Sequence, residues 1–313
     1  MRPLARPASP ADPAVQEISP GIYAYIQPDG SWWINNAGFL TASQGITAID
    51  TCSTQRRTAA FREAMADVSP RPVRTLINTH HHGDHTYGNY QFPGATIVAH
   101  ERCRAEVLRA GPPGDRAAAT WNTPEWGALQ VAAPFLTFTD NIKLWADDLC
   151  CEVSHVGTPA HTDNDSVIWI PERRVLFAGD LLFNGGTPFV LAGSLAGSLR
   201  AVEALADLGA QIIVPGHGPI CGPEVIGEVR GYLSFVDDFA RKTHAAGLSP
   251  LEAARACDLR EYADLLDSER IVGNLYRAYA ELDGQQPGVP VDQAAAMRDM
   301  VAFNDGRPLT CRA

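Results

Sequence analysis

A heptapeptide in the first third of the chain concentrates side chains that bind metal ions. Thr79 to His85 has the sequence THHHGDH, and within it His80, His82, Asp84 and His85 form the pattern H-x-H-x-D-H. Imidazole is the usual nitrogen ligand for zinc, and carboxylate is an accepted oxygen ligand. Without a metal ion, this spacing would crowd three imidazole rings beside one carboxylate with little packing benefit. The pattern therefore predicts a metal site rather than a solvated polar loop.

Three later segments each add one ligand-type side chain at a loop that follows a predicted strand. The side chains are His161, Asp180 and His217, in the segments VGTPAH, FAGD and VPGHG. A single histidine or aspartate at a strand end is more often structural than functional. Three of them, following the first motif, instead favour one shared site.

The predicted elements place these side chains at the ends of buried strands, which is where open α/β sheets hold their sites. In the first half we expect strands over 21–26, 32–34, 37–40, 45–50, 73–78 and 94–100, with a helix over 54–68. In the second half we expect strands over 135–138, 142–145, 149–156, 166–170, 174–178 and 211–214, and helices over 198–208 and 223–245. Two strand-rich halves, each followed by helices, predict two packed sheets with helices outside.

The ordered set of ligand-type residues resembles the two-metal pattern of the metallo-β-lactamase superfamily, and the resemblance extends from about Val15 to Tyr232. It implies an α/β fold of the αβ/βα sandwich type with the metal ions at one edge. It also implies two bound Zn²⁺ ions, although other divalent metals remain possible. The implied ligands are His80, His82 and His161 for the first ion, Asp84, His85 and His217 for the second, and Asp180 as the bridge. In that pattern His81 has no ligand role, and we expect it to point away.

Two features indicate which branches of the superfamily the chain resembles most. Asp180 stands where the antibiotic-hydrolysing members commonly carry cysteine, so the chain is more similar to the glyoxalase II, lactonase and thioesterase-like branches. Residues 187–198 (TPFVLAGSLAGS) and 299–309 resemble the aromatic-polyketide cyclases and their uncharacterised relatives. The cyclases are an antibiotic-biosynthesis branch, and their resemblance rests on segments without an assigned chemical role.

The implied chemistry supports two reactions. Two divalent ions would lower the pKa of a bridging water and make hydroxide available, and Asp84 would orient it and later shuttle a proton. We expect a hydrolase that acts on a hydrophobic ester, thioester or lactone. The alternative is a polyketide cyclase that closes a ring by aldol condensation and dehydration. A purely structural metal module is disfavoured, because structural zinc sites are closed four-ligand cages.

The segment after Asp180 suggests what kind of substrate the site accepts. In residues 181–191 the polar side chains are Asn184 and Thr187, and no lysine or arginine is present to bind a carboxylate or phosphate. With a tryptophan-containing loop over 111–134, this favours a bulky, uncharged or aromatic substrate. The same apolar segment would also be expected if these residues only filled the core. Trp32 and Trp33 are likewise expected to belong either to the core or to the pocket wall.

The 313-residue chain has the composition of an ordinary globular protein, with 45% hydrophobic and 19% charged residues and a net charge of −11. The lack of a basic run argues against nucleic-acid binding, including a nuclease, and no apolar run is long enough to span a membrane. Residues 1–14 are predicted to be a disordered leader without signal-peptide character, so we expect a cytoplasmic protein. The seven cysteines include no CxxC pair and are expected to be incidental thiols.

The predicted catalytic domain covers residues 15–246, and a helical C-terminal extension covers 247–313. The extension begins with a capping signal, in which Ser249 precedes Pro250 and Glu252. Further helices are predicted over 268–282 and 291–303. We expect this extension to pack as a cap on the main domain.

Overall fold

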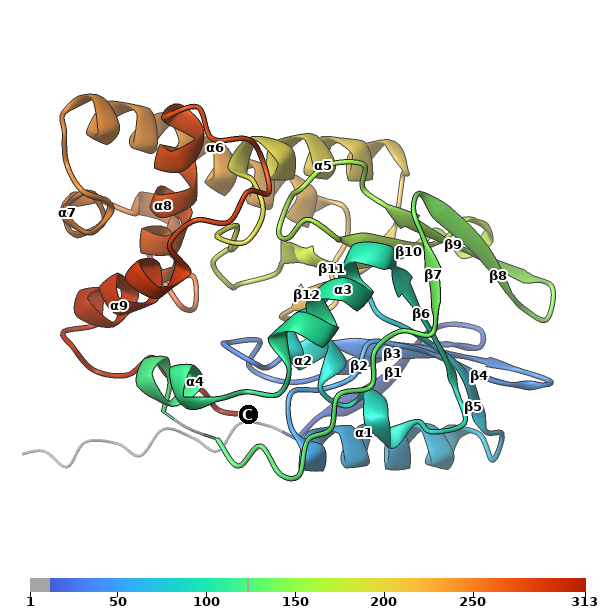
Figure 1. The fold of residues 1–313 in the computed structure, drawn as a ribbon. Helices are drawn as coiled ribbons and strands as arrows, with labels where there is room; N and C mark the ends of the chain where they lie inside the picture. Colours follow the sequence, from blue (N-terminus) through green and yellow to red (C-terminus); the bar gives the residue numbers. More distant parts are fainter. Residues whose placement is uncertain (1–11, 123) are drawn as a thin grey trace, which may run out of the picture.

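Two β-sheets face each other in the computed structural model, which describes residues 12–122 and 124–313 (Figure 1). The first has the order β1-β2-β3-β4-β5-β6-β7 and the second the order β12-β11-β10-β9-β8. The first comprises β1 (Ala14–Ser19), β2 (Ile22–Ile26), β3 (Ala37–Ala42), β4 (Gly45–Ile49), β5 (Val73–Ile77), β6 (Thr96–His100) and β7 (Leu136–Phe138). The second comprises β8 (Asn141–Ala146), β9 (Leu149–His155), β10 (Ser166–Ile170), β11 (Val175–Phe183) and β12 (Ile212–His217).

Helices cover the outer faces of both sheets, which confirms the predicted αβ/βα sandwich. Figure 1 shows α1 (Gln55–Val68) beneath the first sheet, and α5 (Leu195–Asp207) and α6 (Glu224–Ala245) above the second. The α1 helix begins after Thr54, whose side chain accepts a hydrogen bond from the Arg57 N–H and so satisfies one of the unpaired amides of the first turn. None of the helices in the described part of the chain is both long and apolar enough to cross a bilayer.

Alternation along the strands divides the core into layers. In β2, Ile22 and Ala24 face the second sheet, where they pack with residues such as Ile168 and Phe177. Tyr25 lies on the opposite face of the same strand, and its ring packs against Phe61 of α1 at 4.8 Å between centroids. Successive side chains of a strand point to opposite faces, so one short strand contributes to both layers.

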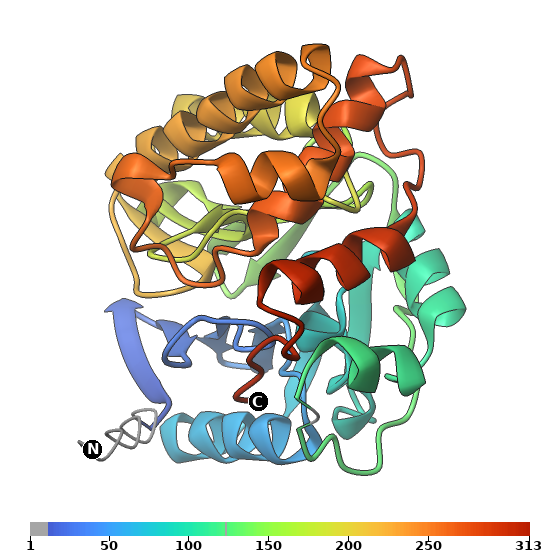
Figure 2. The ribbon, with the colours of Figure 1, turned by 90° about the vertical axis from the view of Figure 1, so that its left-hand side faces the viewer.

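The C-terminal helices share a core with the second half of the sandwich. They are α7 (Pro250–Ala256), α8 (Arg270–Leu282) and α9 (Gln293–Phe303), close to the predicted ranges. Ser249 caps α7 in a capping box with Glu252, as the sequence predicted. Ile271 of α8 and Met300 of α9 belong to the same buried cluster as Trp169 of β10. Figure 2 shows α9 running across the side of the molecule, close to the short helix α4 (Asp115–Thr120).

Three local predictions need correction or lie outside the described residues. Residues 32–34 form a loop rather than a strand, because Trp33 adopts a left-handed backbone conformation with φ of 67° that a strand cannot accommodate. The segment 111–134, expected to be irregular, contains α4. Of the predicted leader 1–14, residues 1–11 lie outside the described residues and Ala14 belongs to β1.

Candidate metal centre

All seven predicted ligand side chains meet at one edge of the sandwich, where strands from both sheets end. His80 and His82 lie in the loop after β5, and the next turn forms the short helix α2 (Gly83–Thr86). That helix carries Asp84 and His85. The second sheet supplies Asp180 within β11 and His217 at the end of β12, and the loop between β9 and β10 supplies His161. The side chains form two groups: His80, His82, His161 and Asp180, and Asp84, His85 and His217.

The close approach of β11 and β12 at this edge requires a residue without a side chain. A Cβ atom built on Gly216 would lie 2.0 Å from Oδ1 of Asp180, a distance that no substituent could tolerate. The glycine one residue before His217 therefore leaves room for the Asp180 carboxylate between the strands. This is the physical basis of the proline-glycine-histidine sequence that pointed to the site.

The ring nitrogens of the three-histidine group converge within hydrogen-bonding distance of one another. His80 Nε2 lies 3.1 Å from His82 Nδ1, and His82 Nδ1 lies 2.8 Å from His161 Nε2. All three side chains are at least partly buried. Which atom donates in these contacts depends on which ring nitrogens carry hydrogens. The hydrogen-bond partner of the other nitrogen in each ring determines this.

Those partners assign a tautomer to four of the five clustered histidines. His161 Nδ1 donates to the Phe189 carbonyl at 2.5 Å, and His217 Nδ1 donates to the Gly30 carbonyl at 3.1 Å. Because a carbonyl only accepts, both rings carry a hydrogen on Nδ1 and direct Nε2 at the cluster. His85 is fixed in the same way, since its Nδ1 lies 2.9 Å from Oδ2 of Asp50.

The fourth histidine is fixed through a relay of two hydrogen bonds. Thr79 Oγ1 donates to Asp50 Oδ2 at 2.8 Å, so it is free to accept from the Nδ1–H of His80 at 3.0 Å. The Nε2 lone pair of His80 therefore also faces the cluster. The nitrogens of His80 and His161 both lie about 3 Å from His82 Nδ1, which can donate at most one hydrogen, so a cation held among the three rings would satisfy them better than a hydrogen bond could.

Asp180 lies between the two groups and contacts both. Its Oδ2 is 3.3 Å from His161 Nε2 and 3.3 Å from His217 Nε2. Its Oδ1 is 3.0 Å from His85 Nε2, yet both of these buried atoms lack a hydrogen-bond partner. This pair lacks hydrogen-bond geometry, and a shared metal ion in place of a proton would satisfy both atoms. The donor set, imidazole nitrogen with carboxylate oxygen, also suits zinc and similar divalent ions.

The electrostatics of the cluster separate it into a neutral and a charged side. Burial lowers the pKa of His80 and His82, and neighbouring imidazoles lower it further, so both rings are held in the neutral form that binds metal. Burial also opposes the charged form of His85, but the carboxylates of Asp180 and Asp50 outweigh it and raise its pKa. Positive charge is therefore stabilised on the side where carboxylates are concentrated.

Asp50 is a functional residue that the sequence did not identify as such. Its buried carboxylate accepts from the backbone N–H and hydroxyl of Thr79 as well as from His85. It therefore holds two histidines, one in each group. Its position at the end of β4 was visible in the sequence, but its backbone φ of 58° and its partners were not. A non-glycine residue in this conformation is uncommon and often marks a functional site.

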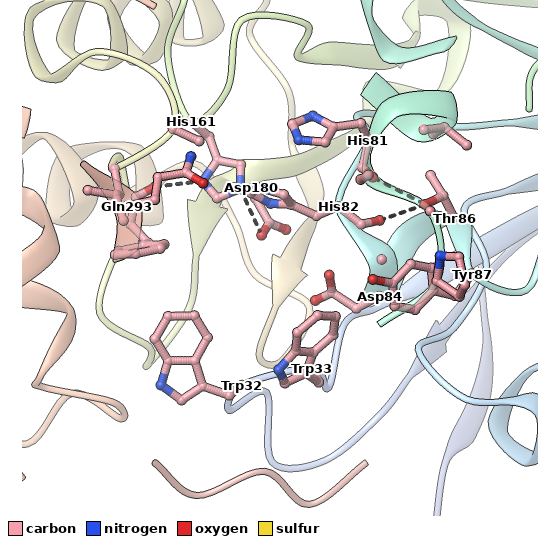
Figure 3. Close-up of a pocket in the computed structure, with 18 of the residues that line it drawn as sticks. Trp32, Trp33, His81, His82, Asp84, Thr86, Tyr87, His161, Asp180 and Gln293 are labelled. Atoms are coloured by element: carbon pink, nitrogen blue, oxygen red, sulfur yellow. Dashed lines mark hydrogen bonds and ion pairs between the residues drawn. The ribbon is translucent and has the colours of Figure 1, made fainter. Parts of the chain in front are cut away.

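A cavity of about 270 Å³ opens beside the cluster and is bordered by Asp84, Asp180, His82, His161 and His217. Figure 3 shows Trp32 and Trp33 on the side of the cavity opposite His161 and Asp180. Much of the remaining wall is aromatic or aliphatic, including Tyr87, Trp121, Leu129, Val131, Phe183, Phe189, Leu191 and Met297. The two tryptophans and the segment after Asp180 therefore form pocket wall as well as core.

Two features of this wall did not follow from the sequence. Residues 181–191 carry no lysine or arginine, but packing brings two arginines from other segments to the cavity. Arg109 comes from α3 (Glu101–Ala110) and the buried Arg270 from α8. His81 also lines the cavity instead of pointing away, although it lies outside both groups and its ring contacts Asn164 at 2.9 Å.

Comparison with known proteins places these observations in a family. The family model described as "Metallo-beta-lactamase superfamily" matches residues 30–217. The chain is 28% identical over 194 residues to the 2,4-dinitroanisole O-demethylase subunit alpha of Nocardioides sp., covering 59% of this chain and 54% of that protein. It is also 28% identical over 181 residues to the human acyl-coenzyme A thioesterase MBLAC2, covering 52% and 62%. The linear primary-alkylsulfatase of a Pseudomonas species is 23% identical over 327 aligned residues, covering 86% and 60%.

The chain thus spans less than two thirds of the length of each of these three relatives. Solved structures share the fold. A metallo-beta-lactamase from Pontibacter korlensis superposes with a TM-score of 0.59 at 19% identity, covering 71% of this chain and 99% of that one. The sec-alkylsulfatase Pisa1 from Pseudomonas superposes with a TM-score of 0.63 at 16% identity, covering 86% and 50%. Sandwich, ligand-type cluster and family match agree, and the chain belongs to the metallo-beta-lactamase superfamily.

Proposed function

We propose that the protein is a dinuclear metallohydrolase, with zinc as the preferred metal. His80, His82 and His161 would hold one ion, Asp84, His85 and His217 the other, and Asp180 both. The observation that carries the proposal is the buried pair of His85 Nε2 and Asp180 Oδ1, 3.0 Å apart without a hydrogen-bond partner, between two groups of clustered ligand atoms. Two ions bound there would supply Lewis acidity and lower the pKa of a water molecule between them.

The chain's own residues would bind and orient the substrate and move the proton. Asp84 borders the cavity, and its Oδ2 lies 3.4 Å from His217 Nε2. We propose that this carboxylate orients the attacking water, accepts its proton and passes it to the leaving group. In the overall reaction a water oxygen bonds to the acyl carbon, the bond to the leaving oxygen or sulfur breaks, and the leaving group gains a proton.

We propose that the substrate carries a hydrophobic acyl group, as an ester, thioester or lactone. The wall formed by Trp32, Trp33 and Trp121 favours a flat or aromatic group, and the cavity volume accommodates one or two rings. The human relative named as an acyl-coenzyme A thioesterase is consistent with an acyl substrate. Arg270 does not contradict an uncharged group, because Asp267 lies 2.9 Å from its guanidinium and offsets its charge. The cytoplasmic location stays a prediction.

Metal content is the first test. The purified chain, reconstituted with Zn²⁺ and freed of excess metal, should retain about two ions per chain, because seven clustered ligands with Asp180 between the groups suit two ions better than one. Elemental analysis of this protein measures the ratio directly. A ratio of one, obtained at saturating metal, would contradict the dinuclear assignment.

The reaction is tested by product mass. Fully metallated protein should hydrolyse hydrophobic aryl esters or thioesters to products heavier in total by one water, while β-lactams react weakly or not at all. The aromatic wall also suits polyketide cyclisation, which would instead convert a bicyclic polyketone to a product lighter by one water. Mass spectrometry of both substrate classes separates the two reactions. No change in either class would contradict both proposals.

A further inference from the structure

One face of helix α8 holds the loop that orients His161. Arg270, Asn274 and Arg277 are spaced four and three residues apart, so their side chains emerge on the same side of the helix. All three are almost completely buried, with exposed fractions of 2%, 0% and 0%. Burying two guanidinium groups and an amide is unfavourable unless their polar atoms find hydrogen-bond partners. An apolar helix face could be buried without this desolvation penalty.

Their partners are concentrated in the backbone between β11 and α5. Arg270 donates to the Thr187 carbonyl at 2.9 Å, and Arg277 donates through Nη2 to the Leu191 carbonyl at 3.1 Å. Asn274, between them on the helix, donates to the Pro188 carbonyl at 2.8 Å and accepts from the Val190 N–H at 2.9 Å. The amide of Asn274 therefore fixes the loop on both sides of residue 189.

The Phe189 carbonyl, which receives no hydrogen bond from α8, is the one that orients His161. Phe189 offers its carbonyl oxygen to His161 Nδ1 at 2.5 Å, and this contact places the Nε2 lone pair of His161 toward His82. The ring of Phe189 also lines the cavity, and it packs edge-on against Trp32 at 5.2 Å between centroids. Displacing the loop would thus affect both His161 and the substrate wall.

The hydrogen bonds that orient the second group of ligands come from different parts of the chain. Arg270 alone approaches this group indirectly, because it lies over the Phe183 ring, which stacks on His217 at 5.1 Å between centroids. His217 donates to Gly30, and His85 to Asp50, both in the first half of the sandwich. No contact with α8 is involved in either hydrogen bond. The family match, moreover, ends at residue 217, so α8 lies outside it.

We propose that Asn274 and Arg277 are positioning residues for the three-histidine group, so that this face of α8 is required for full occupancy of one metal position and not of the other. The proposal rests on the proposed function, in which that group holds an ion. It predicts an asymmetry that a purely structural role of α8 would not produce.

The test is a chelator titration of Zn²⁺-loaded protein carrying Asn274→Leu, which keeps the side-chain size but leaves the Val190 N–H and the Pro188 carbonyl without partners. We expect one ion to dissociate at about 10- to 100-fold lower chelator concentration than in the wild type, while the other is unchanged. Tyr276→Phe is the matched control, because it removes a hydrogen bond from the same helix to Asp299 of α9 and not to the loop. It should leave both ions as in the wild type.

A second variant keeps the test decisive if Asn274→Leu does not fold. Arg277→Lys retains the charge but loses the contacts of the guanidinium with the Leu191 carbonyl and, outside the loop, with the Val289 carbonyl, and should weaken the same ion to a smaller extent. Equal weakening of both ions, or unchanged affinity for both in a folded variant, would overturn the positioning role. A wild type that binds fewer than two ions would instead contradict the proposed function itself.

Discussion

Asp180→Ala is expected to lower kcat/KM for an aryl ester by about 10³-fold or more, and to leave no more than one tightly held metal ion per chain. Oδ2 of Asp180 lies 3.3 Å from Nε2 of both His161 and His217, and Oδ1 lies 3.0 Å from Nε2 of His85. Alanine removes the one negatively charged ligand shared by both groups, so the ions would lose their common anchor. A 10³-fold loss corresponds to roughly 4 kcal/mol of transition-state stabilisation.

Elemental analysis and steady-state kinetics of the same preparation measure the two effects together. Asp165→Asn serves as the control, because Asp165 is a buried aspartate close to His161 that belongs to neither group. Its carboxylate accepts from the N–H and hydroxyl of Thr162. This variant should keep both ions. A folded Asp180→Ala protein with two bound ions and wild-type turnover would show that Asp180 does not bridge.

The sequence predicted the cluster because most ligands lie at or just after the end of a strand, and these strands end at one edge. Asp180, which was predicted in a loop, lies within β11. His217 could be assigned from a short segment, since Gly216 before it reflects a close approach of β11 and β12 that the fold requires. Gly157, before His161, instead has a positive φ of 75°. Asp50 was missed for the opposite reason. Its role depends on a positive φ and on partners more than 25 residues away, and neither leaves a local signature.

The substrate wall was less predictable than the metal cluster. The loop at Trp33 looked like a strand, because aromatic and β-branched residues favour strands and the backbone conformation that interrupts one is not encoded by a glycine. Arg270 lines the cavity because tertiary packing places α8 beside it, with the guanidinium 4.1 Å from the centre of the Trp32 ring. Periodicity finds helices such as α8, but it does not tell which buried polar residues meet a distant loop.

The second large effect is expected for Asp84→Asn, which retains the shape and one oxygen of the side chain but cannot take up a proton. Asp84 Oδ2 lies 3.4 Å from His217 Nε2 and 3.8 Å from His85 Nε2, and the residue borders the cavity. Asparagine can still contact an ion held by the two histidines. We therefore expect kcat to fall by about 10²- to 10³-fold, with KM changed little, as for the loss of a general acid–base group.

The leaving group separates proton transfer from ligand loss. An aryl ester with a nitrophenol leaving group needs little protonation as its bond breaks, whereas an alkyl ester with the same acyl group must receive a proton. If Asp84 delivers that proton, Asp84→Asn should reduce turnover of the alkyl ester at least tenfold more than turnover of the aryl ester. Equal losses on both substrates, accompanied by loss of one ion in elemental analysis, would show that Asp84 acts as a ligand alone.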